Sequence, residues 1–133
     1  MIKAKKSLGQ NFLIDKKILD KIVEITNIEN KSVIEIGPGT GNLTSFILKK
    51  NPKKFFVIEK DNKLAIFLED KFNDKLTIIN DDILNIDENN LFDNKVIVFG
   101  NLPYNISSQI LVKIIKFNKW PPKYSDLILM FQY

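Results

Sequence analysis

The chain contains no cysteine, no histidine and no arginine among its 133 residues. Without cysteine it has neither a disulfide framework nor a thiolate metal site, which agrees with a reducing compartment. Without histidine, reactions that use imidazole as the general base and the usual zinc sites are excluded. Without arginine there are no bidentate contacts to phosphate, so any grip on a nucleic acid must come from lysine point charges and depend on salt.

Long hydrophobic runs are also lacking. The N-terminal segment is too polar for a signal peptide or a membrane span, so we expect a cytoplasmic protein without membrane contact. The composition, 44% hydrophobic and 11% aromatic, suffices for the core of one domain or part of one. A net charge of +4 favours a polyanionic partner, but a compositional bias toward lysine explains it equally well.

The chain is organised around residues 33–44, which read V-I-E-I-G-P-G-T-G-N-L-T. A β-branched run, three alternate glycines and a helical pattern predict a strand, a tight turn and a helix N-terminus. Gly37, Gly39 and Gly41 permit positive φ angles and let a ligand lie against the backbone. With Glu35 ahead of Gly37, the spacing differs from the dinucleotide pattern G-x-G-x-x-G. It resembles motif I of the class I S-adenosylmethionine methyltransferases, although a Rossmann-type turn without this cofactor stays possible.

The rest of the chain predicts a Rossmann-like α/β sheet of about five parallel strands. Asp15 is the expected N-cap of the first helix. The expected helices cover about residues 16–25, 42–50 and 62–72, and the expected strands cover 33–36, 55–58, 76–79, 96–99 and 127–131.

Two acids follow predicted strands, where open α/β sheets bind ligands. Glu59 follows the second strand 22 residues after Gly37, close to the offset of roughly 20 at which an acid reaches a ribose diol. Asp82 follows the third strand, where its oxygen could accept a hydrogen bond from an adenine amino group. Alternatively, Glu59 is a solvated acid and Asp82, like Asp81, a turn former.

The fourth strand leads into Gly100-Asn101-Leu102-Pro103-Tyr104. This stretch resembles motif IV of amino-methyltransferases, [D/N/S]-P-P-[Y/F], in the form N-L-P-Y. The Asn101 side-chain oxygen and a carbonyl stiffened by the following proline can both accept from one exocyclic NH₂ group, while an aromatic ring stacks on the base. The predicted catalytic residues are Asn101, Leu102, Pro103 and Tyr104.

With G-Q-N-F-L at residues 9–13, these motifs resemble the ribosomal RNA adenine dimethyltransferases of the KsgA type over about residues 5–132. The resemblance implies dimethylation of two adjacent adenosines near the 3′ end of small-subunit ribosomal RNA, in immature subunits, by a full-length monomer that needs no metal. It implies a target adenosine flipped out of its stack. The implied binding residues for S-adenosyl-L-methionine are Asn11, Leu13, Gly37, Gly39, Gly41, Glu59, Asp82 and Asn101.

The chain departs from the family pattern in two respects. After M-F-Q at residues 130–132 the family usually has a Lys-Glu pair, whereas this chain has Tyr133. The family sheet normally has seven strands and is followed by a helical RNA-contacting domain, so residues 1–133 are expected to be the N-terminal part of the methyltransferase domain. Residues 127–131 would then form an apolar edge strand. Three alternatives stay open: a macrolide-resistance type of large-subunit ribosomal RNA methyltransferase, a non-catalytic assembly or transcription factor of the same fold, and an NAD-dependent oxidoreductase, which the glycine spacing disfavours.

Overall fold

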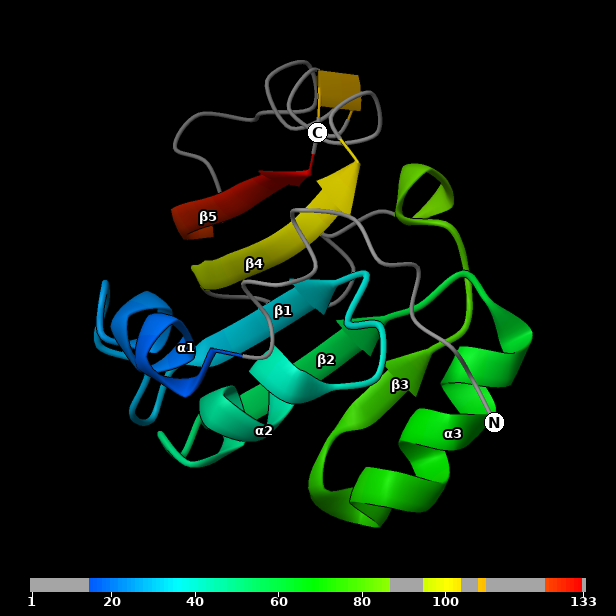
Figure 1. The fold of residues 1–133 in the computed structure, drawn as a ribbon, viewed down its shortest axis with the longest axis horizontal. Helices are drawn as coiled ribbons and strands as arrows, with labels where there is room; N and C mark the ends of the chain where they lie inside the picture. The colour runs from blue at the N-terminus through cyan, green and yellow to red at the C-terminus, as the bar shows by residue number, and fades with distance from the viewer. Residues whose placement is uncertain (1–14, 87–94, 104–107, 110–123, 133) are drawn as a thin grey trace.

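A computed structural model describes residues 15–86, 95–103, 108–109 and 124–132. In this part of the chain five parallel strands form one sheet in the order β3-β2-β1-β4-β5 (Figure 1). The chain builds β2 and β3 on one side of β1 and then returns to build β4 and β5 on the other. This confirms the predicted α/β architecture and puts a topological switch point between β1 and β4. The strands are β1 (Ser32–Ile36), β2 (Lys54–Ile58), β3 (Thr77–Ile79), β4 (Val96–Pro103) and β5 (Tyr124–Gln132).

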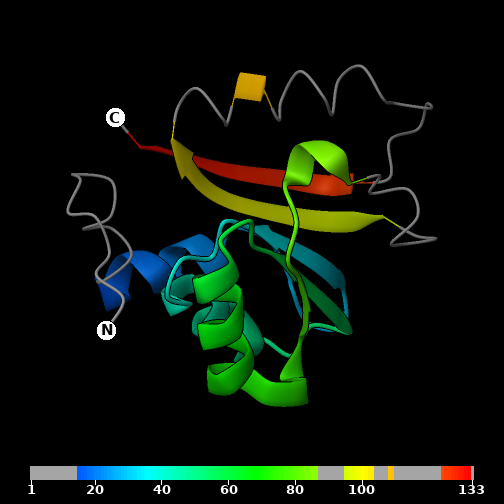
Figure 2. The same ribbon diagram turned by 90° about the vertical axis from the view of Figure 1, so that its right-hand side faces the viewer.

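Three helices pack against the same face of the sheet, as the side view shows (Figure 2). They are α1 (Lys16–Val23), α2 (Asn42–Leu48) and α3 (Asn62–Phe72). Asp15 caps α1 as predicted, because its carboxylate accepts the Lys17 N–H at 2.9 Å, and Asp61 caps α3 in the same way. Two short 3₁₀ helices, η2 (Asn73–Lys75) and η3 (Ile83–Asn85), follow α3 and β3.

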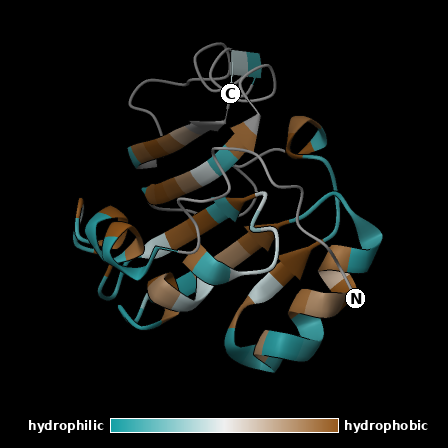
Figure 3. Ribbon diagram, in the orientation of Figure 1, coloured by the Kyte–Doolittle hydropathy of each residue, from teal (hydrophilic) through white to brown (hydrophobic). Residues whose placement is uncertain are grey.

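The strands separate two hydrophobic cores because successive side chains point to opposite faces. On the helix-covered face, Val33, Val57 and Phe99 are each fully buried against the apolar sides of the helices. On the other face, Ile34 and Ile58 pack with Ile83 of η3. The hydrophobic colours therefore follow the strands, whereas the hydrophilic colours lie on the outer sides of α1 and α3 (Figure 3). Both faces of the central strands are thus sealed from water.

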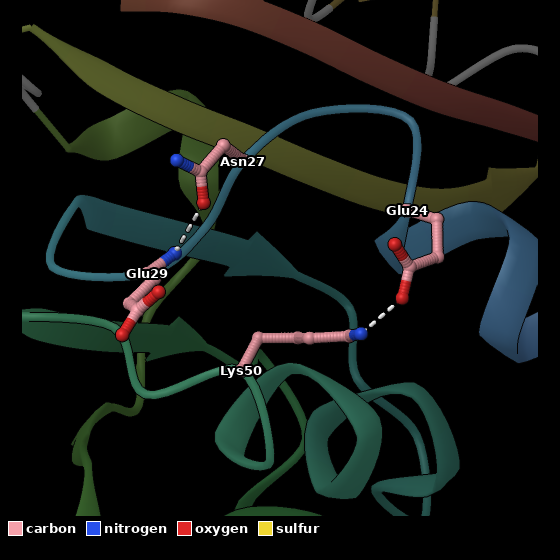
Figure 4. A network of polar contacts seen from close by, with 4 residues as sticks. All are labelled: Glu24, Asn27, Glu29 and Lys50. Carbon is pink, nitrogen blue, oxygen red and sulfur yellow. Dashed lines mark hydrogen bonds and ion pairs between the residues drawn. The ribbon is translucent and has the colours of Figure 1, made fainter.

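The amino ends of the strands are closed by contacts between loops. Glu24, directly after α1, forms an ion pair with Lys50, shortly after α2, and Asn27 accepts the Glu29 N–H at 3.2 Å (Figure 4). The Asn30 N–H donates to the Asn51 carbonyl at 2.9 Å, which joins the loops that precede β1 and β2. These bonds hold together the loops at the amino edge of the sheet, opposite the edge where the strands have their carboxyl ends.

Several predicted boundaries shift in the structure. The first helix ends at Val23 rather than at residue 25, and Ile25 is 64% exposed. The Glu24 N–H still bonds back into the last turn, after which Ile28 supplies the next buried side chain. The second helix ends at Leu48 and the third strand begins at Thr77.

The largest change concerns β4. It was predicted to end at residue 99, but it continues to Pro103 because β5 pairs with it along residues 97–103. β5 likewise extends beyond the predicted 127–131 to Tyr124–Gln132. The predicted N-L-P segment is therefore part of a strand and not of a loop.

Candidate active site

The glycine loop joins β1 to α2 at the carboxyl edge of the sheet, and all three glycines have positive φ angles, from 60° to 88°. A Cβ on Gly37 would lie 2.6 Å from Leu102 Cδ2 on β4, and a Cβ on Gly41 would lie 2.6 Å from Phe72 Cε2 on α3. A side chain at either position would force Leu102 or Phe72 to shift, so these two glycines let the loop pack closely against β4 and α3. The sequence predicted the turn but not these two packing partners.

Gly39 differs from the other two glycines. No atom in the described part of the chain lies within 4 Å of a Cβ built there. Its φ of 60° is the remaining reason for glycine, since L side chains rarely adopt this conformation. The middle of the loop therefore presents bare backbone, and its N–H is directed at the Glu59 carboxylate.

Glu59 follows β2 and is only 7% exposed. Its backbone N–H bonds the Ile79 carbonyl at 3.0 Å, and its carboxylate accepts the Asp61 N–H at 2.9 Å. Burial raises the pKa of Glu59 above its ordinary value, although the N–H groups of Asp61 and Gly39 oppose this rise. The acid is thus fixed at a strand end and connected to the middle of the glycine loop. This burial contradicts the alternative that Glu59 is a solvated acid at the strand end.

Glu35 is a further buried acid to which the sequence analysis gave no role of its own. It lies on β1, is 2% exposed, and accepts a hydrogen bond from Thr44 Oγ1 on α2 at 2.5 Å. Burial raises the pKa of Glu35 to about 8, although the Thr44 bond lowers it, and the nearby Glu59 carboxylate adds to the rise. This acid joins the strand before the loop to the helix after it. The sequence signal was an acid inside an otherwise apolar strand.

Asp82 is half-buried after β3 and caps η3, because its Oδ1 accepts the Leu84 N–H at 3.0 Å. It also lines an open cleft of about 350 Å³ together with Gly37 and Glu59. Its turn-forming and ligand-facing positions are therefore compatible. The other described residues that line this cleft are Ile36, Ile58, Lys60, Asp61, Ile83, Leu84, Leu102 and Gln109.

Asn101 and Leu102 lie on β4 beside the start of the glycine loop. Leu102 is 8% exposed and lines the cleft, and the Asn101 carbonyl oxygen lies 3.8 Å from a Cβ built on Gly37. The Asn101 Nδ2 atom is buried and has no hydrogen-bond partner among the described residues. A buried donor left without a partner costs roughly 1–3 kcal/mol, so Asn101 Nδ2 is a polar atom whose bonding the described residues leave incomplete.

The structure thus brings Gly37, Glu59, Asp82 and Leu102 together in one cleft, with Asn101 adjoining it. Gly41 instead packs against α3. Three other sequence-predicted residues, Asn11, Leu13 and Tyr104, lie outside the described residues, and the backbone of Pro103 ends β4. The described residues contain no group of three or more potential metal ligands and no helix long and apolar enough to span a membrane.

A family model described as "Ribosomal RNA adenine dimethylase" matches residues 1–133. The chain belongs to the ribosomal RNA adenine dimethylase family. Among curated relatives, it is 60% identical over 134 residues to the ribosomal RNA small subunit methyltransferase A of Pelagibacter ubique, covering 98% of the chain and 50% of that protein. Its identity to the protein of the same name in Rhizobium meliloti is 41% over 133 residues, covering 97% and 48%.

Solved structures of methyltransferases share the fold. The 23S ribosomal RNA methyltransferase ErmE matches with a TM-score of 0.77 at 26% identity, over 92% of this chain and 48% of that one. A dimethyladenosine transferase from Plasmodium falciparum matches with a TM-score of 0.72 at 30% identity, over 89% and 42%. These matches confirm the class I methyltransferase architecture. The chain spans about half the length of the curated relatives it matches.

Proposed function

We propose that residues 1–133 are the N-terminal part of the S-adenosylmethionine-dependent methyltransferase domain of an enzyme that dimethylates N6 of two adjacent adenosines near the 3′ end of small-subunit ribosomal RNA. The family match and the names of the curated relatives support a ribosomal RNA adenine substrate. In this proposal the enzyme acts in the cytoplasm as a full-length monomer on immature small subunits and contributes to their maturation.

One structural observation carries the proposal. Gly37 of the glycine loop, the buried Glu59 and the half-buried Asp82 line one cleft, and the buried Asn101 amide, which has no described partner, lies on β4 beside the start of that loop. Open α/β sheets bind ligands at this place, outside the strand carboxyl ends at the switch point. These residues fit a cofactor whose ribose carries two free hydroxyls and no phosphate, because the carboxylate at the end of β2 can accept hydrogen bonds from two vicinal hydroxyls.

S-adenosylmethionine, when bound, supplies an electrophilic methyl group on a sulfonium. In the proposal Glu59 accepts hydrogen bonds from the ribose hydroxyls, and the glycine loop lies against the methionine and ribose end. Asp82 accepts from the adenine amino group of the cofactor. Asn11, Leu13 and the Asn101 side chain complete the set, with the amide Nδ2 as an available donor. Glu59 is already held by the Asp61 N–H, and the loop by backbone bonds from Gly37 to Ile58 and from Gly41 to Pro38, so little ordering is needed on binding.

The target adenine requires alignment more than deprotonation. Its exocyclic nitrogen is a poor nucleophile because the lone pair is delocalised into the ring. Asn101 Oδ1 and the Leu102 carbonyl accept from its two N–H groups, turn the amine toward the methyl group and favour the pyramidal nitrogen of the transition state. Pro103 stiffens the Leu102 carbonyl, and the Tyr104 ring stacks on the base. The excess proton leaves to water after transfer.

The test is methyl transfer from labelled donor by the complete natural polypeptide. We expect label in small-subunit ribosomal RNA of immature subunits, at two adjacent adenosines. Transfer to no ribosomal RNA, with the donor bound, would contradict the enzyme proposal and favour a non-catalytic assembly factor.

A second candidate function has specific structural support. ErmE, named as a 23S ribosomal RNA methyltransferase, matches this chain with a TM-score of 0.77, slightly above the Plasmodium protein at 0.72. The same assay separates the two candidates if protein-free 23S ribosomal RNA is offered beside immature small subunits. Label confined to the 23S RNA would replace the small-subunit proposal with the large-subunit one.

A further inference from the structure

We propose that a basic groove between α2 and the C-terminal end of α3 binds the phosphate backbone of the substrate RNA, at a place separate from the active-site cleft. This inference rests on the proposed function in one respect, because it takes the bound RNA to be the ribosomal RNA substrate of the enzyme. The groove has a volume of about 720 Å³. Its described lining residues are Ser45, Leu48, Lys49, Asn51, Pro52, Lys53, Phe55, Lys71, Phe72 and Lys75, none of which lines the active-site cleft.

The charge of the groove carries the argument. Four of its lining residues are lysines, all exposed, and none of its described lining residues is an aspartate or a glutamate. The chain as a whole has 16 acids against 20 lysines, so an even mixture would have put acids here as well. Asp70 and Asp74 lie next to two of these lysines in the sequence but do not line the groove. None of the four lysines forms an ion pair with another described residue.

A neighbouring hollow shows that a lysine-rich composition alone does not produce this pattern. It has a volume of about 510 Å³ and is lined by Lys49 and Lys50, but also by Glu24 and Glu29. There Lys50 is paired with Glu24, as the close-up view shows (Figure 4). The charge of that hollow is therefore balanced within the protein. Lys49 lines both hollows, but the other three lysines of the groove, Lys53, Lys71 and Lys75, have no acid among its described lining residues, so a polyanion would complement their charge.

The kind of contact follows from the side chains. The two aromatic residues of the groove, Phe55 and Phe72, are only 5% and 6% exposed, which leaves little ring surface on which a base could stack. Lysine ammonium groups bind phosphate as point charges and do not read base edges. The groove should therefore bind RNA without sequence preference and with a marked salt dependence. Its role would be to hold the substrate particle while the cleft acts on the target base.

Lys71 has a second contact that matters for the design of a test. Its Nζ donates to the Thr40 carbonyl of the glycine loop at 2.9 Å and lies 5.3 Å from the Phe72 ring centre. Removing this side chain would disturb the glycine loop as well as the groove. The test variant therefore changes only Lys49, Lys53 and Lys75 to glutamine.

The matched control changes three exposed lysines of α1, Lys16, Lys17 and Lys21, to glutamine, so both variants lose the same charge. RNA affinity is measured on the complete polypeptide with a small-subunit ribosomal RNA hairpin and with polyuridine of equal length, at several salt concentrations. We expect the groove variant to bind both RNAs about tenfold more weakly, with a salt slope smaller by about 2. The control should change affinity less than threefold, and donor affinity should stay the same in both.

Equal losses in the groove variant and the control would show that only net charge matters and would overturn the proposal. Unchanged RNA affinity in the groove variant would do the same. If the parent bound polyglutamate more tightly than RNA through these lysines, the partner would be an acidic protein. Failure of the proposed function is a distinct result, because the parent would then transfer no methyl group while the groove variant still lost RNA affinity.

Discussion

The two sides of the switch point differ in how their polar groups are satisfied. On the side of β1 to β3, the acids Glu35, Glu59 and Asp82 each accept a hydrogen bond from a neighbouring protein donor. On the side of β4, the buried Asn101 Nδ2 has no described partner. Acids that are already held by protein donors keep their geometry without a ligand, whereas a buried donor that no described residue satisfies can gain a bond from a ligand. We infer a preformed cofactor side and a β4 side whose amide completes its bonding in the complex.

The largest expected effect comes from Glu35, on the side of β1 to β3. Its folded pKa of about 8 exceeds its ordinary value of 4.5 because of burial, and each unit of difference corresponds to about 1.4 kcal/mol. The pKa of Glu35 is higher in the folded protein than in the unfolded chain. The free energy of unfolding is therefore highest below pH 4.5, where both states hold the proton, and it falls as pH rises toward 8. Glu35→Gln stays neutral and keeps an acceptor for Thr44.

We therefore expect the Gln variant to match the parent at pH 4 and to exceed its free energy of unfolding by up to roughly 4–5 kcal/mol at pH 9. Urea denaturation at both pH values measures this difference. Glu59 is present in both proteins, but its carboxylate adds to the raised pKa of Glu35, so part of the expected difference at pH 9 is relief of the repulsion between the two carboxylates. A variant that is less stable than the parent at pH 9 would mean that Glu35 is ionised and paired in the fold.

The next effect concerns Asn101, on the β4 side. Asn101→Ala removes the side-chain oxygen that is proposed to accept a hydrogen bond from the adenine amine. That hydrogen bond is expected to strengthen as the amine nitrogen becomes pyramidal in the transition state. Loss of one such oriented group costs on the order of 10²-fold in turnover, by analogy with an oxyanion-hole donor. Single-turnover methyl transfer with saturating donor measures it. Because the variant also removes a buried donor that has no partner among the described residues, its thermal stability should not fall. Full activity with unchanged donor affinity would contradict the catalytic assignment.

A smaller effect is expected at Glu59. Glu59→Ala should weaken donor binding by about 1–3 kcal/mol, because the ribose hydroxyls lose a charged acceptor in a partly desolvated cleft. Gly39→Val should weaken it further, since a β-branched residue is strained at a φ of 60°. Calorimetric titration with S-adenosylmethionine gives both values. A Glu59 variant that binds the donor as tightly as the parent would remove this acid from the ribose site.

The smallest effect is expected from Tyr104→Phe. The proposal assigns the ring and not the hydroxyl to base stacking, so most activity should remain, whereas Tyr104→Ala should cost about 1–3 kcal/mol in adenosine engagement. The KM for RNA and the rate at saturating RNA distinguish the two variants. Equal losses in both would indicate a role for the hydroxyl.

Local sequence patterns predicted one side of the switch point better than the other. The bounds of α3, the cap at Asp15, and the strand, turn and helix around the glycines follow from periodicity, capping and backbone preferences, all of which act over a few residues. By contrast, Gly100-Asn101-Leu102-Pro103 has the local composition of a turn. Its place in β4 depends on pairing with β5, about 30 residues further along the chain.

Burial was the other quantity that local patterns could not supply. Glu35 was read only as part of a motif, because nothing in the sequence says that Thr44 and the helix-covered face enclose it. Likewise, Gly37 and Gly41 were assigned to the turn and to cofactor binding, whereas their close packing against Leu102 and Phe72 was not predicted. The strand-end acids were predictable because parallel strands bring their carboxyl ends to one edge whatever covers the faces.

The division between the two sides can be tested in one experiment on the complete polypeptide. Donor affinity and the single-turnover rate at saturating donor and RNA are measured together for Glu59→Ala and Asn101→Ala. We predict that the Glu59 variant loses roughly 5- to 150-fold in donor affinity, equivalent to about 1–3 kcal/mol, but keeps most of its rate. The Asn101 variant should lose about 10²-fold in rate with a much smaller change in donor affinity. The reverse pattern, or equal losses of affinity and rate in both variants, would contradict the separation of cofactor and adenosine roles across the sheet.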